Sequence, residues 1–166
     1  MARIKDARPY LFLIAILIVV ADRLSKLWIV AHIKSGEAIT VIPHVFRLTH
    51  VLNTGAAFSM FEGGQHQQLV LNVLIGFSAL VAVVILGVIV KAGRAFSLMT
   101  VSLALILGGA AGNLYDRMHL HYVVDFLEVH IVHYHWPDFN VADSAICVGA
   151  CLLLLEMLRP QKTSDH

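Results

Sequence analysis

The sequence predicts an all-α integral membrane protein with four transmembrane helices and a small outward-facing β cradle. Of the 166 residues, 58% are hydrophobic and only 14% are charged, and the mean hydropathy of +0.78 is unlike that of a soluble domain. Four apolar stretches are each long enough to cross about 30 Å of hydrocarbon as a helix. They lie at roughly 10–31, 69–90, 95–115 and 141–158. At this length we expect a single membrane-embedded domain, 1–166.

The Lys and Arg residues outside these stretches are unevenly distributed. Seven lie in the termini and the middle connection, against three in the other two connections. Because short segments rich in Lys and Arg stay in the cytoplasm, this asymmetry predicts cytoplasmic N- and C-termini. The segments 32–68 and 116–140 then face outward. The net charge of +1 and the absence of a basic block give no indication of nucleic acid binding.

The first apolar stretch allows two interpretations. Its basic start, apolar core and small residues Val19 and Ala21 would also suit a cleavable signal peptide. We favour a retained helix, because apolar character resumes beyond the supposed cut in LWIVA.

Charged residues lie near the outward end of this helix. Asp22 and Lys26 are four residues apart, so their side chains share a helix face and can form an ion pair. Two interpretations stay open: a structural pair, with Arg23 and Lys26 extending to the lipid headgroups, or a functional polar site.

The outward segment 32–68 has a different composition. AITVIPHVFRLTHVLNTG is rich in β-branched and aromatic residues, which predicts one or two short strands. We expect a β platform on the outer membrane surface. It is followed by GAAFSMF, whose small residues permit close backbone approach, and by a turn at Glu62, Gly63 and Gly64.

The later apolar stretches are predicted to pack against each other. The second is interrupted only by Asn72 and Ser78. The third ends in small residues, of which Gly108 and Gly112 are four apart and would let another helix approach closely. An alternative is that they make room for a substrate chain. Cys147 and Cys151 share one face of the fourth stretch and are expected to pack there without forming a disulfide.

Two acids, Asp125 and Asp143, lie at the edges of apolar segments, where ionisable groups are costly and mark functional sites. The connection between them is free to fold back, so the two carboxyls can meet. Two charges ~4 Å apart would repel by about 4 kcal/mol at an effective dielectric of 20, so the pair would share one proton. Such a pair can activate a water for hydrolysis without a metal or covalent intermediate. The alternative is that both acids cap helices.

Histidines are abundant in the segment 116–140. A zinc site is one interpretation, but His130, His133 and His135 do not match a helical HExxH pattern, although Glu128 is nearby, and no cysteine can assist. We therefore expect solvated histidines and no metal. They are His119, His121, His130, His133 and His135.

Five short motifs resemble those of the lipoprotein signal peptidases (signal peptidase II), aspartic proteases of the bacterial cytoplasmic membrane. The motifs are DRLSK at 22–26, NTGAAFS at 53–59, GGAAGNLYDR at 108–117, VVDF at 123–126 and FNVADS at 139–144.

The resemblance implies that Asp125 and Asp143 form a catalytic dyad. The substrate would be a prolipoprotein whose Cys carries a diacylglyceryl group, cut just before that Cys. The resemblance further implies four transmembrane helices in the inner membrane, a site at the outer (periplasmic) face, no cofactor, and lipid as surroundings; we expect a monomer. Substrate-binding or pocket-shaping positions would be Asp22, Lys26, Asn53, Asn113, Arg117, Asn140 and Ala142.

Two other classes of protein share some of these sequence features. A transporter or proton pathway would also place ionisable groups in membrane helices, but it would have them near mid-bilayer. Asp22, Asp125 and Asp143 instead gather toward one face. A structural subunit would explain the small residues of the third helix but not two isolated acids beside Asn140 and Arg117.

Overall fold

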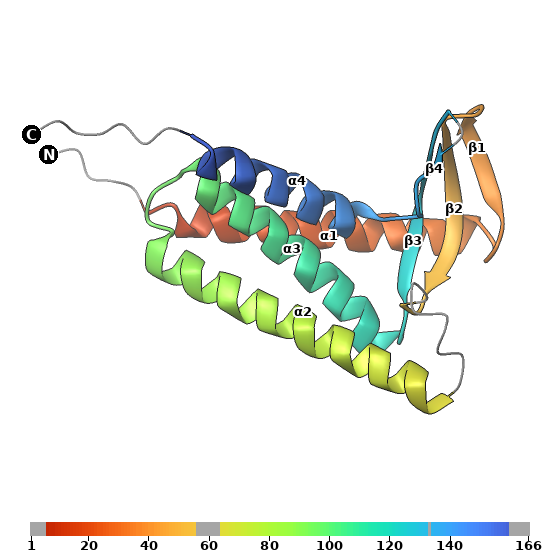
Figure 1. Cartoon of the computed structure of the whole chain (residues 1–166), viewed down its shortest axis with the longest axis horizontal. Helices are drawn as coiled ribbons and strands as arrows, with labels where there is room; N and C mark the ends of the chain where they lie inside the picture. Colours follow the sequence, from red (N-terminus) through yellow and green to blue (C-terminus); the bar gives the residue numbers. More distant parts are fainter. Residues whose placement is uncertain (1–5, 56–63, 133, 160–166) are drawn as a thin grey trace, which may run out of the picture.

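The fold is a bundle of four helices with a small antiparallel sheet at one end (Figure 1). The computed structural model describes residues 6–55, 64–132 and 134–159. The start of α1, the end of α4 and the α2–α3 turn lie together at the end opposite the sheet. A backbone hydrogen bond of 3.1 Å from Ala7 to Arg94 joins two of them. The helices are α1 (Arg8–His32), α2 (Gly64–Ala92), α3 (Leu98–His119) and α4 (Val141–Met157).

Two of these helices, α2 and α3, are long and apolar enough to cross a membrane by length and composition. The other two helices, α1 and α4, do not meet this criterion, each for its own reason. α1 has 25 residues but carries Asp22, Arg23 and Lys26. α4 has 17 residues, which rise about 26 Å. The part of the chain that the structure describes therefore has two candidate spans out of the four that were predicted.

The exposure pattern of α1 is inverted relative to a soluble helix. Its buried stripe includes Asp22 and Lys26, each 1% exposed, whereas Leu24 is 61% exposed. Apolar residues also cover the outside of α2, where Phe77 is 66% exposed. Polar groups inside and apolar groups outside are what a lipid environment favours.

Helix α3 differs from the predicted third stretch at both ends. It begins at Leu98 because Ser97 is its N-cap, with a side-chain oxygen that accepts a hydrogen bond from the backbone of Thr100. It continues to His119, so Asp116 and Arg117 lie in its last turn and not in a loop.

The small residues of α3 allow close helix packing, as we predicted. A Cβ on Gly108 would lie 2.7 Å from the backbone oxygen of Ala15 in α1, so only glycine fits. A Cβ on Gly112 would lie 2.8 Å from a carboxylate oxygen of Asp22. The α1–α3 interface thus needs glycine at the level of the buried acid.

The sheet has the order β1-β2-β3-β4, and all described neighbours are antiparallel. One or two strands were predicted in the first outward segment, and two are present, β1 and β2. Two strands in 116–140 were not predicted, and Asp125 lies within one of them. The strands are β1 (Ala38–Ile42), β2 (Phe46–Asn53), β3 (Val123–Ile131) and β4 (Tyr134–His135).

A small apolar cluster fixes β3 against the outward end of α1. It is formed by Ile29 of α1 and its C-cap residue Ile33 with Val124 and Phe126 of β3, all at most 4% exposed. Because Val124 and Phe126 flank Asp125 in sequence, their burial holds that carboxyl at the junction of bundle and sheet. A second apolar cluster, around Leu11, lies toward the other end of the bundle.

Candidate active site

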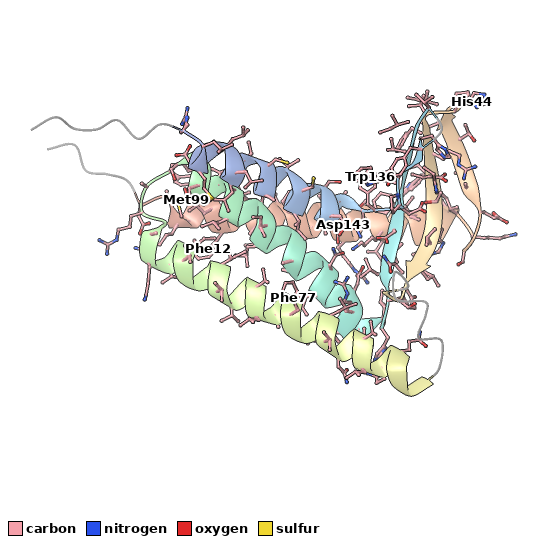
Figure 2. All side chains as sticks on the ribbon, in the orientation of Figure 1. Phe12, His44, Phe77, Met99, Trp136 and Asp143 are labelled. Carbon is pink, nitrogen blue, oxygen red and sulfur yellow. The ribbon has the colours of Figure 1, made fainter. Side chains whose placement is uncertain are left out.

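Asp125 and Asp143 come together at the end of the bundle that faces the sheet. Figure 2 shows Asp143 at this end, while Phe12 and Met99 lie toward the opposite one. Asp125 is brought by β3, where it pairs with Val51 of β2. Asp143 is brought by the first turn of α4.

Asp125 is held by two side-chain amides. The Nδ2 of Asn53, at the end of β2, donates to its Oδ2 at 2.8 Å. The Nδ2 of Asn140 donates to its Oδ1 at 2.7 Å. With both oxygens bonded and only 2% of the residue exposed, the carboxyl has a fixed orientation.

Asp143 is held through the N-terminus of α4. Asn140 is the N-cap of this helix, and its Oδ1 accepts from the backbone of Asp143 at 2.9 Å. In return the Oδ2 of Asp143 accepts from the backbone of Asn140 at 3.1 Å, which completes a capping box. The other oxygen, Oδ1, accepts from Nδ2 of Asn113 at 2.8 Å. The capping role considered for Asp143 is therefore real and coexists with its place beside Asp125.

Asn140 is the shared neighbour of the two acids. Its side chain donates to Asp125 and caps the turn that carries Asp143, and it is fully buried. The two carboxyls are thus one residue apart in the hydrogen-bond network, although 18 positions separate them in the sequence. Such an arrangement couples their charges.

The environment of Asp125 favours its protonated form. Burial is the largest cause and raises the pKa of this carboxyl to about 6 from 3.8. The negative charge of Asp143 raises the pKa further, while the hydrogen bonds from Asn53 and Asn140 oppose the shift. Asp125 therefore holds a proton more readily than an ordinary carboxyl does.

Behind the two acids lies a buried ionic cluster centred on Lys26. Its Nζ lies 2.8 Å from Oδ2 of Asp22 and 2.8 Å from Oδ2 of Asp116. It also donates to Oδ1 of Asn113 at 3.2 Å. The predicted Asp22–Lys26 pair is confirmed, but the idea that Lys26 extends to the headgroups is wrong, because its side chain is 1% exposed.

This ionic cluster is connected to Asn113, to Asn140 and to α4. Asn113, which Lys26 orients, donates to Asp143, and its oxygen accepts from Asn140 at 3.2 Å. Asp22 accepts from the backbone of Ala142 at 3.0 Å, which satisfies a free amide of the first turn of α4. The charge at Lys26 therefore fixes the position of the turn that carries Asp143.

Asp116 is a member of the cluster that sequence reasoning did not include among the site residues. It is fully buried between Lys26 and Arg23, whose Nη1 donates to it at 3.2 Å. A signal was present, since Asp116 follows Asn113 by three positions and so shares its helix face.

The remaining predicted site residue, Arg117, is half-buried in the last turn of α3. Its guanidinium interacts electrostatically with Asp143, Asp125 and Asp116. It supplies positive charge to the same end of the bundle. Of the motif NTGAAFS, the residues 56–59 lie outside the described residues, as do the predicted turn residues Glu62 and Gly63.

Known proteins match this chain over most of its length. Lipoprotein signal peptidases of Syntrophotalea carbinolica and Bacillus velezensis are 46% and 42% identical to it, over 90% and 89% of this chain and 91% and 92% of theirs. The enzyme of the same name from Pseudomonas aeruginosa is 42% identical over 95% of this chain and 92% of its own.

Solved structures of bacterial membrane enzymes have a similar fold. A bacterial membrane enzyme determined by the in meso method at 1.9 Å superposes with a TM-score of 0.81 and 29% identity, covering 92% of this chain and 95% of that one. A family model described as signal peptidase (SPase) II matches residues 14–159. With a family match over residues 14–159 and relatives that are 42–46% identical over most of its length, the chain belongs to the signal peptidase II family.

Proposed function

We propose that this protein is an aspartic endopeptidase that cuts diacylglyceryl-modified prolipoproteins just before the lipidated Cys, with Asp125 and Asp143 as its catalytic pair. Family membership supports the coarser activity, removal of signal peptides from prolipoproteins. The observation that carries the proposal is Asn140, which bonds to the Asp125 carboxyl and caps the turn of Asp143.

The proposed reaction uses one water and one shared proton. Asp143, ionised, takes a proton from the water, and the resulting hydroxide adds to the scissile carbonyl carbon. Asp125, protonated, donates a hydrogen bond to the carbonyl oxygen as negative charge develops there. The proton is then passed to the leaving amine of the lipidated Cys, the C–N bond breaks, and the signal peptide leaves with a carboxyl terminus.

The other polar residues divide by burial. Asn53 and Arg117, both half-buried, are proposed to contact substrate backbone. Asp22 and Lys26 are 1% exposed, which favours a supporting role through Ala142 and Asn113 in place of the substrate contact first expected for them.

We further propose that all four helices span the bacterial inner membrane, with cytoplasmic termini and the site at the outer face. The exposed leucines of α1 and the positive charge at the α2–α3 turn support this orientation. A lipid-anchored substrate moves within the membrane plane, so a site at the outer interface would meet the scissile bond at its own depth while the acyl chains stay in lipid.

Purified protein in detergent should cleave a diacylglyceryl-modified precursor much faster than the same precursor without the lipid, because the lipid keeps the scissile bond at the depth of the site. Mass spectrometry of both products gives the cut position, expected directly before the modified Cys. Adding EDTA should leave the rate unchanged, since the reaction uses no metal. Equal cutting of the unlipidated precursor would instead indicate a general intramembrane protease.

A further inference from the structure

Three side chains on the sheet, away from the acids, converge on one point. Glu128 and His130 are two residues apart in β3, so their side chains share a face of the strand. His135 of β4 pairs directly with His130 across the hairpin, which brings the two rings to 4.8 Å between centroids. Sequence spacing alone does not bring His135 to Glu128; the antiparallel pairing does.

The donor atoms of these side chains are close to one another. The Oε1 of Glu128 lies 2.6 Å from Nε2 of His135 and 3.2 Å from Nε2 of His130. One donor atom from each residue fits within 4.8 Å of the other two. For comparison, donors on a tetrahedral zinc ion are ~3.3 Å apart when the bonds are about 2.0–2.1 Å.

One of these atoms is buried without a hydrogen bond. Among the described residues, Nε2 of His130 has no partner in hydrogen-bond geometry, even though the Glu128 oxygen is near. Buried polar atoms in proteins almost always have a partner, because leaving one unsatisfied is costly. A cation between the three donors would satisfy this nitrogen and the carboxylate together.

We propose that Glu128, His130 and His135 form a binding site for a divalent transition metal, with Zn²⁺ the best match. Two imidazoles and one carboxylate are a common three-residue zinc set that leaves a fourth position open. The side chain of His135 is 51% exposed, so water can reach that fourth position. His133, the third histidine of the sequence-based zinc hypothesis, lies outside the described residues.

Arg47 of β2 orients the carboxylate of this site. Its Nε pairs with Oε2 of Glu128, and its Nη2 donates to Oε1 at 2.8 Å. When a metal binds Oε1, the Nε contact can remain on Oε2, as outer partners of metal-bound carboxylates do. The hydrogen bonds from Arg47 are the largest cause that lowers the pKa of Glu128, to about 2.

The site is separate from the proposed hydrolytic pair. Asp125 and Glu128 are three residues apart in one strand, so their side chains point to opposite faces of it. A metal there would fasten the two-residue strand β4 to β3 and would take no part in peptide hydrolysis. The inference therefore does not depend on the proposed function.

The test is zinc binding by the full-length protein, purified in detergent without a histidine tag and freed of metal. At about pH 7.5, calorimetry with ZnCl₂ should give one equivalent per chain. His130→Gln and His135→Gln should each weaken binding by at least about tenfold. His119→Gln, which changes an exposed histidine of α3, should bind as the wild type does.

Two further measurements separate metal binding from folding. Far-UV circular dichroism should be the same for all variants, because the side chains of His130 and His135 are 32% and 51% exposed and belong to neither apolar cluster. Zinc should raise the thermal midpoint of the wild type and of His119→Gln but not of the double variant His130→Gln/His135→Gln. Wild-type protein that takes up no more zinc than this double variant would overturn the proposal.

Discussion

Replacing either Asp125 or Asp143 by Asn should lower cleavage of the lipidated precursor by at least about 10³-fold. Asn has nearly the same shape but can neither hold nor accept the transferred proton. The oxygen of each new Asn can still accept from one amide donor, such as Asn140 at position 125 or Asn113 at position 143, while its NH2 loses the other bond. Single-turnover rates, measured on variants that insert and elute as the wild type does, give the comparison.

The matched control is Asp138→Asn. Asp138 lies in the same outward segment, and its Oδ1 accepts from the hydroxyl of Thr49 at 2.6 Å, a bond that an Asn oxygen can also accept. This variant should cleave normally. Substantial turnover by Asp125→Asn or by Asp143→Asn would remove that residue from the catalytic pair.

Replacing Lys26 by Met should destabilise the fold by about 3–5 kcal/mol, because it leaves buried Asp22 without a cation and buried Asp116 with Arg23 alone. Asp22 and Asp116 are each at most 2% exposed in their side chains and lie 2.8 Å from the Lys26 nitrogen. Activity should fall as well, since Asp22 holds Ala142 and Lys26 holds Asn113. Equilibrium unfolding in mixed micelles with increasing SDS measures the loss.

Lys91→Met is the control for this change. Lys91 lies exposed in the last turn of α2, so its removal should alter stability by less than about 1 kcal/mol. If Lys26→Met unfolded at the same SDS concentration as the wild type, the ionic cluster would not be what holds α1, α3 and α4 together.

The helices were predictable from the sequence because their apolar stretches are long and interrupted by few charges. The ends of the helices were less predictable. Helix α3 starts at Leu98 because Ser97 caps it. It extends through Asp116 and Arg117 because Asp116 faces the buried Lys26 and Arg117 faces carboxylates. Neither cause is visible in a hydropathy pattern.

Strand β3 was missed for a different reason. Val123, Val124, Asp125 and Phe126 are all buried, so the alternation of apolar and polar residues that marks a half-buried strand is absent. Its neighbours β2 and α1 are distant in sequence, and only tertiary packing brings them to it.

The candidate site was predictable in its members but not in its connections. The two acids stood out because acids beside hydrocarbon are rare. Asn140 and Asp143 also have the spacing of a capping box, which predicts their mutual bonds. The contacts of Lys26 with Asp116 and of Glu128 with His135 depend on how helices and hairpin pack, and no local pattern encodes them.

The most direct test of the shared proton is a ¹³C NMR titration of the Asp125 carboxyl in detergent micelles. In the wild type the carboxyl should titrate with an apparent pKa of about 6, so it is protonated below that pH and ionised above it. In Asp143→Asn the pKa should fall, because removing the neighbouring negative charge favours the ionised form. An Asp125 pKa that stays the same in Asp143→Asn would contradict the coupling on which the proposed mechanism depends.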